Sequence, residues 1–170
     1  MHVIILITLN LNKLKKVFFI VVMFAPAFVQ NSFAQEKTTQ PSQILQSYFS
    51  IKNALVAGNT NNASMSAQEF VKALNGADPQ TINETSRSAL LKDAGQISEN
   101  RDIKHQREHF ATFSTDMYAL AKSVKLTGEP GYYAYCPMKK AYWLSNEAVI
   151  KNPYYGSVML TFGKVTETLK

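Results

Sequence analysis

The sequence has a single cysteine and, beyond residue 16, no concentration of basic residues, and both shortages restrict what the protein can be. Only Cys136 carries a thiol among 170 residues, so an internal disulfide is impossible. The 18 Lys and Arg residues outnumber the 12 Asp and Glu residues, which gives a formal net charge of +6. Because the basic residues are scattered along the chain, we expect no nucleic-acid partner.

Sequence signatures of common enzymes are also missing. The chain has no glycine-rich phosphate loop, no nucleotide-binding fingerprint, no H-E-x-x-H motif and no evident pair of catalytic carboxylates. A nucleophilic Cys136 would need a base within hydrogen-bond reach and a group to orient that base, and no local signature of a thiol enzyme surrounds it. We therefore predict that the protein is not an enzyme.

The first 34 residues have the organisation of a secretory signal peptide. Three lysines between residues 13 and 16 precede an apolar run over residues 17–29, and Ser32-Phe33-Ala34 supplies small residues at a cleavage site. The apolar run is short for a membrane span and contains Pro26. We expect cleavage after residue 34, a periplasmic location and no membrane span in the mature chain; an uncleaved anchor is the alternative.

Residues 35–41 are polar and are predicted to be a disordered lead-in, after which four helices are expected over residues 42–127. Apolar residues recur every three or four positions from Ile44 to Leu55 and define the first helix, with Gly58 at its end. A capping box at Ser66–Glu69 predicts the start of the second helix, which ends near Gly76.

The third helix is expected over residues 83–100, and the fourth follows it closely. Apolar residues seven apart mark the fourth helix: Ile103, Phe110, Met117 and Val124. Short connections between such helices favour an up-down antiparallel bundle. The predicted fold class is therefore all-α, a bundle of about four helices in one domain with an irregular C-terminal segment over residues 128–170.

In that C-terminal segment, residues 132–135 are expected to be extended, residues 146–151 to form one helical turn, residues 152–156 to form a turn, and residues 158–162 to be β-like. Six tyrosines and the only tryptophan lie between residues 132 and 155. Large aromatic side chains can anchor an irregular segment to a bundle, or they can present a surface to a partner protein. Both interpretations stay open at this point.

Three sulfur atoms in the segment suggest a metal site. Pro137 disfavours helix at Cys136, and in an extended chain Cys136 and Met138 would face the same side. Met159 is expected to lie on the strand face opposite its apolar neighbours. A thiolate with two thioethers is a soft ligand set that selects Cu(I) or Ag(I). The alternative is that all three side chains are core residues, because methionine and free cysteine are both commonly buried.

Two histidines are the other candidate ligands. His105 and His109 are four residues apart and share one face of the predicted fourth helix, with Asp116 on nearly the same side. An H-x-x-x-H spacing suits a metal but is common by chance. We expect His105 to be exposed, whereas His109 flanks Phe110 and is the candidate fourth ligand beside the sulfur atoms.

Residues 135–163, YCPMKKAYWLSNEAVIKNPYYGSVMLTFG, resemble the signature of an uncharacterised (DUF-type) bacterial domain family. That signature reads C-P-M, W-L-S, N-P-Y-x-G and M-L-x-C-G, and the upstream stretches YFSIKNALVAGN and QREHFATFSTDMYALAK resemble the helical part of the family. The resemblance covers roughly residues 42–167. Members occur as single secreted domains or attached to the periplasmic adaptor subunit of copper and silver efflux systems of the RND type.

The resemblance implies a periplasmic domain connected with soft metals, and it points to Cys136, Met138 and Met159, with His109 as a weaker candidate. Phe162 stands where the family has its second cysteine, so a two-thiolate site is impossible in this chain. We therefore expect binding of Cu(I) or Ag(I) for sequestration or for hand-over to an efflux adaptor. The alternative is a metal-free protein-interaction module of the cell envelope, with Cys136 and the methionines in its core.

Overall fold

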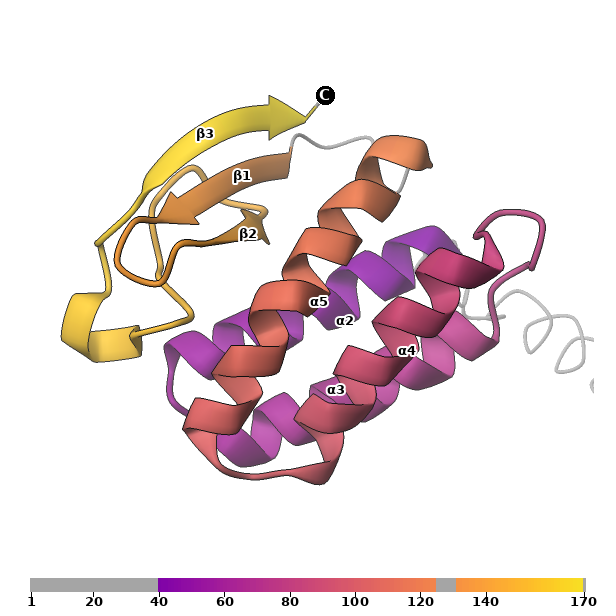
Figure 1. The fold of residues 1–170 in the computed structure, drawn as a ribbon, viewed down its shortest axis with the longest axis horizontal. Helices are drawn as coiled ribbons and strands as arrows, with labels where there is room; N and C mark the ends of the chain where they lie inside the picture. Colours follow the sequence, from indigo (N-terminus) through magenta and orange to yellow (C-terminus); the bar gives the residue numbers. More distant parts are fainter. Residues whose placement is uncertain (1–39, 125–130, 170) are drawn as a thin grey trace, which may run out of the picture. The chain divides into compact units, whose positions relative to one another are not determined.

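The structure, a computed structural model, describes residues 40–124 and 131–169, and the two ranges form four helices, three strands and one 3-10 helix (Figure 1). The predicted signal peptide lies outside the described residues, as do residues 35–39 of the predicted lead-in. In chain order the elements are α2 (Gln40–Val56), α3 (Thr60–Asn75), α4 (Glu84–Glu99), α5 (Ile103–Ser123), β1 (Gly131–Cys136), β2 (Ala141–Ser145), η1 (Gly156–Met159) and β3 (Lys164–Leu169).

The four predicted helices are present, and side-chain caps set where three of them begin. Asn59, Asn83 and Asp102 each accept a hydrogen bond from the backbone N–H three residues further on. The predicted capping box at Ser66–Glu69 was wrong, because α3 begins at Thr60, well before it. The mostly polar residues 60–64 form the first turns of α3, since Asn59 provides the cap.

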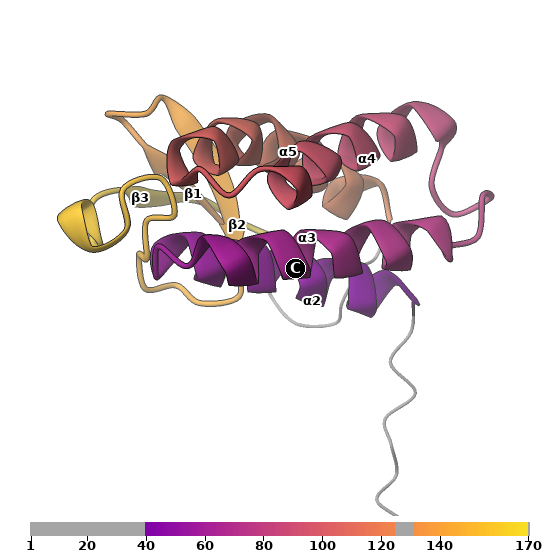
Figure 2. The same cartoon turned by 90° about the horizontal axis from the view of Figure 1, so that it is seen from below.

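The helices pack in chain order, with α4 and α5 lying over α2 and α3 (Figure 2). Their apolar faces meet in a core in which Phe70 and Phe113 pack edge to face with ring centroids 4.7 Å apart, and Tyr48 stacks on Phe110 at 5.5 Å. Each large side chain withdrawn from water in this way contributes about 1.5–3 kcal/mol of transfer free energy. The predicted helical bundle is therefore the core of the fold.

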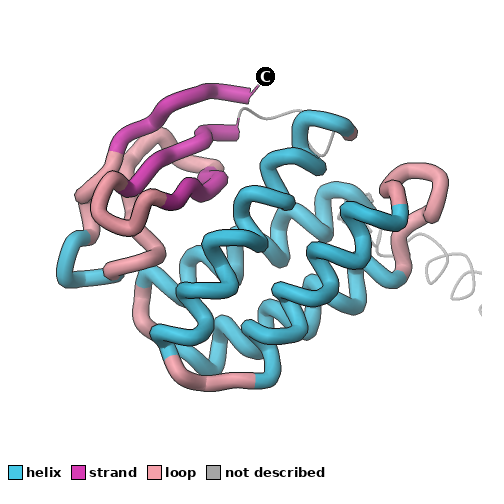
Figure 3. Tube along the Cα trace, viewed as in Figure 1, coloured by secondary structure: helices cyan, strands magenta, loops and turns pink. Residues whose placement is uncertain are grey.

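The predicted all-α class requires a correction, because the C-terminal segment contains an antiparallel sheet with strand order β2-β1-β3. Figure 3 shows the three strands gathered together beside α5. The extended prediction for residues 132–135 is confirmed within β1, whereas residues 146–151 form no helical turn. Residues 158–162 were predicted to be β-like, but they belong to η1 and the turn after it, and the missed strand is β3.

Aromatic side chains attach the sheet to the helices, as one of the two interpretations of their abundance predicted. Tyr118 of α5 stacks on Tyr133 of β1 with ring centroids 3.7 Å apart, and Tyr133 stacks on Tyr142 of β2 at 4.8 Å. Trp143 is fully buried and packs edge to face on Tyr154. These rings supply apolar area that a small three-stranded sheet cannot bury by itself.

Buried polar contacts also join β2 to α2. The Tyr48 hydroxyl accepts a hydrogen bond from the backbone N–H of Leu144 at 2.9 Å and forms a second one with the hydroxyl of Ser114 on α5. One turn further along α2, the ammonium group of Lys52 lies 3.4 Å from Oγ of Ser145, and its side chain is completely buried. Burial lowers the pKa of Lys52 to about 8, and Glu147 offsets part of that effect.

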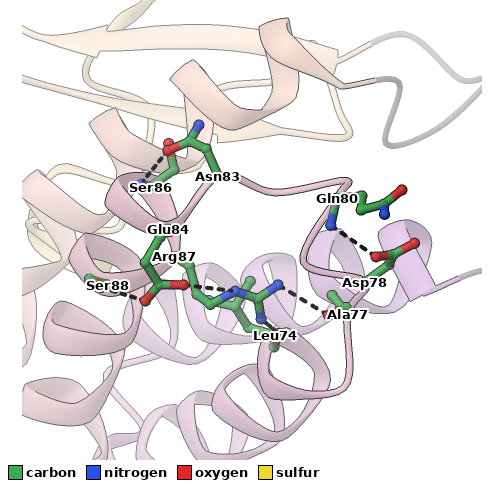
Figure 4. Close-up of polar contacts among 9 residues, drawn as sticks. All are labelled: Leu74, Ala77, Asp78, Gln80, Asn83, Glu84, Ser86, Arg87 and Ser88. Atoms are coloured by element: carbon green, nitrogen blue, oxygen red, sulfur yellow. Dashed lines mark hydrogen bonds and ion pairs between the residues drawn. The ribbon is translucent and has the colours of Figure 1, made fainter.

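A buried arginine organises the connection between α3 and α4 (Figure 4). The guanidinium group of Arg87 on α4 donates hydrogen bonds to the backbone carbonyls of Leu74 and Ala77, which lie at and just beyond the end of α3. Helix ends leave carbonyl groups without partners inside the helix, and a cation is favourable near them. Arg87 therefore fixes the direction in which the chain leaves α3.

The first prediction concerns the buried ammonium of Lys52. At and below pH 7 the folded protein must hold this charge away from water, so Lys52→Met should stabilise it by roughly 1–3 kcal/mol. Between pH 8 and 10.5 the unfolded state binds more protons at Lys52 than the folded state does, so the wild type should recover stability as the pH rises.

The measurement is the free energy of unfolding in urea, for wild type and Lys52→Met, from pH 6 to 11. Tyrosine titration changes the stability of both proteins equally, so it cancels in the difference between them. The gap between them should narrow above pH 8. The exposed Lys92→Met serves as the matched control and should stay within about 0.5 kcal/mol of wild type. If the difference in unfolding free energy between wild type and Lys52→Met does not change with pH, the pKa of Lys52 is not lowered in the folded protein.

Candidate functional site

Cys136 is the last residue of β1, where it pairs with Ala141 of β2. Its side chain is completely buried, and its sulfur accepts a hydrogen bond from Nδ2 of Asn152 at 3.2 Å. A buried sulfur that accepts an N–H is held in one position. Cys136 is therefore a fixed point at the end of the strand.

Asn152 is completely buried and connects Cys136 to the segment that follows η1. Its Nδ2 also donates to the backbone carbonyl of Phe162 at 2.7 Å, and its backbone N–H donates to the carbonyl of Leu160 at 2.8 Å. Its Oδ1 accepts from the backbone N–H of Tyr154 at 2.8 Å. One side-chain amide therefore holds the Cys136 sulfur and residues 160–162 close to each other.

Gly156 explains how the chain turns between Asn152 and Met159. It has a φ angle of +56°, a conformation that residues with side chains rarely adopt. A Cβ atom at this position would lie 2.7 Å from Nη2 of Arg107 and 2.8 Å from the carbonyl oxygen of Val56. The glycine of the N-P-Y-x-G stretch is thus required both for the turn and for close packing on α2 and α5.

The two predicted methionine ligands lie in different surroundings. Met138 is in the turn between β1 and β2 and is 55% exposed. The argument that placed it on the same side as Cys136 required an extended chain, and that premise was wrong because β1 ends at Cys136. Met159 ends η1 and is half-buried, and it directly precedes Leu160, whose carbonyl bonds to Asn152.

His109, the fourth predicted ligand, makes its contacts on the α4 side of α5. Its Nδ1 lies 3.1 Å from Oδ1 of Asp93 on α4, and its ring lies 4.6 Å from the ring of His105. His105, predicted to be exposed, is half-buried. The contacts of His109 therefore differ from those that join Cys136 to Asn152 and residues 160–162.

Asp116, which the sequence placed near the same face, has a raised pKa. Burial is the larger cause and the charge of Asp93 is the second. The carboxyl group of Asp93, which contacts His109, thus raises the pKa of Asp116. Within residues 40–124 and 131–169, no group of three or more His, Cys, Asp and Glu side chains is placed to hold a metal ion, a finding that does not cover methionine sulfur.

The fold and the site together define a class of protein: a helical bundle that carries a small antiparallel sheet and has an anchored cysteine at the end of one strand. A family model described as Protein of unknown function (DUF3347) matches residues 44–129, and the chain belongs to this family. The match spans the helices and stops before β1, so the Cys-Pro-Met segment lies outside it. No curated protein and no solved structure matched the chain.

In the described part of the chain, no helix has the length and apolar character needed to cross a membrane. Sequence reasoning missed three of the residues that shape the site, Asn152, Gly156 and Asp93. The composition of N-P-Y-x-G did indicate a turn there, and residues 153–155 form one. Nothing local in the sequence shows that Asn152 reaches back to Cys136, because that contact joins residues 16 positions apart.

The second prediction concerns the buried amide of Asn152. Asn152→Ala leaves the Phe162 carbonyl and the Tyr154 N–H without their partners, which should cost about 2–3 kcal/mol of unfolding free energy. It should also make Cys136 react faster with a thiol reagent such as DTNB, because the segment that covers the sulfur loses its attachment.

Urea unfolding and the rate of DTNB labelling under native conditions are the two measurements. Asn146→Ala, at an exposed asparagine in the same segment, is the matched control and should change neither quantity appreciably. Equal labelling rates for Asn152→Ala and wild type would show that Asn152 does not keep Cys136 covered.

Proposed function

We propose that the C-terminal segment binds a soft metal ion, Cu(I) or Ag(I), and that the protein acts in metal sequestration or in hand-over to efflux in the periplasm. The observation that carries the proposal is the side chain of Asn152. It bonds to the sulfur of Cys136 and to the carbonyl of Phe162, so the only thiol of the chain lies close to the segment that begins at Met159.

The donor set fits this chemistry. The Cys136 thiolate supplies the negative charge, and the Met159 thioether is a soft donor that no physiological pH protonates. Met138 lies two residues beyond Cys136 in an exposed turn, and its thioether is the third soft donor of the proposed set. Cys136 is completely buried, so binding of a metal ion requires the segment after η1 to move. The hydrogen bond from Nδ2 of Asn152 to the Cys136 sulfur must also break.

That requirement also suits transfer of the ion. If the segment after η1 moves to admit the ion, a partner protein that displaces the same segment can release the ion. The partner we propose is the periplasmic adaptor of a heavy-metal efflux system, which rests on the family resemblance and on the signal peptide expected over residues 1–34. Release to the adaptor involves ligand exchange and no change in oxidation state.

The third prediction is that the reduced protein binds one Cu(I) with sub-nanomolar affinity. Cys136→Ala should abolish the binding, and Met159→Ala should weaken it at least tenfold, because each removes a soft ligand. The measurement is anaerobic competition against a chromophoric Cu(I) chelator. Met65→Ala removes an exposed methionine of α3 and should bind as wild type does. Undiminished binding by Cys136→Ala would refute the site.

A second candidate function is a metal-free protein-interaction module of the envelope. Two observations favour it: Cys136 is completely buried, and the large exposed apolar side chains of the described residues concentrate in the C-terminal segment. Besides Met65 of α3, they are Met138, Val149, Val158, Leu160, Phe162 and Val165. Val158 on η1 is the most exposed of these side chains, at 81%.

The fourth prediction separates the two functions. If the apolar side chains contact the efflux adaptor directly, a double variant Val158→Lys and Phe162→Lys should lose adaptor binding measured by calorimetry without metal. Met65→Lys is the matched control on α3. Adaptor binding that requires Cu(I) and survives the double variant would instead favour the metal proposal.

A further inference from the structure

Two histidines lie together on α5. They are distant in the sequence from Cys136, Met138 and Met159, and the contacts of His109 differ from those of Cys136. The chain has three histidines, His2, His105 and His109, and only the last two are in the described residues. They are separated by one helical turn, and their ring centroids lie 4.6 Å apart with the ring planes 52° from each other. Both side chains are half-buried, so one edge of each remains accessible.

That ring separation matches two imidazoles that bind one metal ion. A metal lies about 2.0–2.1 Å from a coordinating imidazole nitrogen, and roughly 3.2 Å from the centre of that ring. Two such rings at right angles about the ion place their centres about 4.5 Å apart, and a tetrahedral angle places them about 5.2 Å apart. The observed 4.6 Å between the ring centroids lies within this range.

A carboxylate on the neighbouring helix orients one of the two rings. Oδ1 of Asp93 lies 3.1 Å from Nδ1 of His109, which places the proton on Nδ1 and leaves the lone pair of Nε2 for an ion. A carboxylate behind a histidine is the usual arrangement at protein metal sites, where it fixes the tautomer and increases ligand basicity. Burial first and the charge of Asp93 second raise the pKa of Asp116, so a second carboxyl group lies near this part of α4 and α5.

We propose that His105 and His109 form a second metal site, which takes a borderline divalent cation such as Cu(II), Ni(II) or Zn(II) through two imidazole nitrogens, with Asp93 as a positioning residue. The described residues hold no third His, Cys, Asp or Glu donor at this place, so water completes the coordination. Imidazole prefers these ions, and among them Cu(II) binds most tightly. This site is separate from the thiolate site proposed for Cu(I), and neither depends on the other.

The experiment is a titration of the full chain with Cu(II), followed by electron paramagnetic resonance. A His2→Ala background removes the one histidine outside the described residues. One equivalent should give a signal with hyperfine coupling to two nitrogen nuclei. His105→Ala and His109→Ala should each lose the two-nitrogen pattern and bind at least tenfold more weakly, whereas Cys136→Ala should retain it.

Asp93→Asn tests the positioning role. It keeps the shape of the side chain but removes the charge behind His109, and Cu(II) affinity should fall about 10–100-fold while both nitrogen couplings remain. Circular dichroism should show an unchanged helical content, so that a folding defect is not mistaken for lost binding. Lys104→Ala, at an exposed neighbouring position on α5, is the control and should match the background protein.

Two results would overturn the proposal. One is a signal with the same nitrogen coupling in a protein that lacks both His105 and His109, which would place the ion elsewhere. The other is the same Cu(II) affinity in His105→Ala as in the background protein, which would mean that the two rings do not bind one ion together. Both results concern Cu(II) and imidazole only, so they leave Cu(I) binding at Cys136 to its own test.

Discussion

The amide side chain of Asn152 is the interaction on which the C-terminal half of the fold depends. Three of its hydrogen bonds reach the sulfur of Cys136, the carbonyl of Phe162 and the N–H of Tyr154. The bonds to Cys136 and Tyr154 are buried, and the bond to Phe162 is partly buried. Without them, the chain between β2 and β3 would expose unpaired backbone groups to an apolar interior, which is costly. This one residue therefore holds the sulfur of Cys136 against the chain that leads from η1 to β3.

α5 has an equally central place among the helices, because it packs against α4 on one side and β2 on the other. Its two sides carry different chemistry. On the α4 side it brings His105 and His109 together beside Asp93, and on the sheet side Tyr118 stacks on Tyr133. The two histidines and Cys136 are therefore held by different contacts.

The helices could be predicted from sequence because their signal is local: apolar side chains repeat at the period of a helix, and a cap lies at the start. The error at Ser66–Glu69 came from a pattern that fits a capping box but lies inside α3, where Asn59 already provides the cap. The strands were harder to predict. Val158 and Leu160 have β-like composition, yet strand preference depends mostly on neighbours across a sheet, and these residues have none.

The sequence by itself determined that the chain forms helices, that residues 132–135 are extended, that a turn follows Asn152, and that Cys136 lies in the same C-terminal segment as Met138 and Met159. Only the tertiary structure decided that Cys136 is buried against Asn152, that Met138 is exposed, and that Asp93 lies behind His109. Periodicity and turn composition carry information only about the local conformation of a few neighbouring residues. Burial and side-chain orientation depend instead on contacts between residues far apart in the chain.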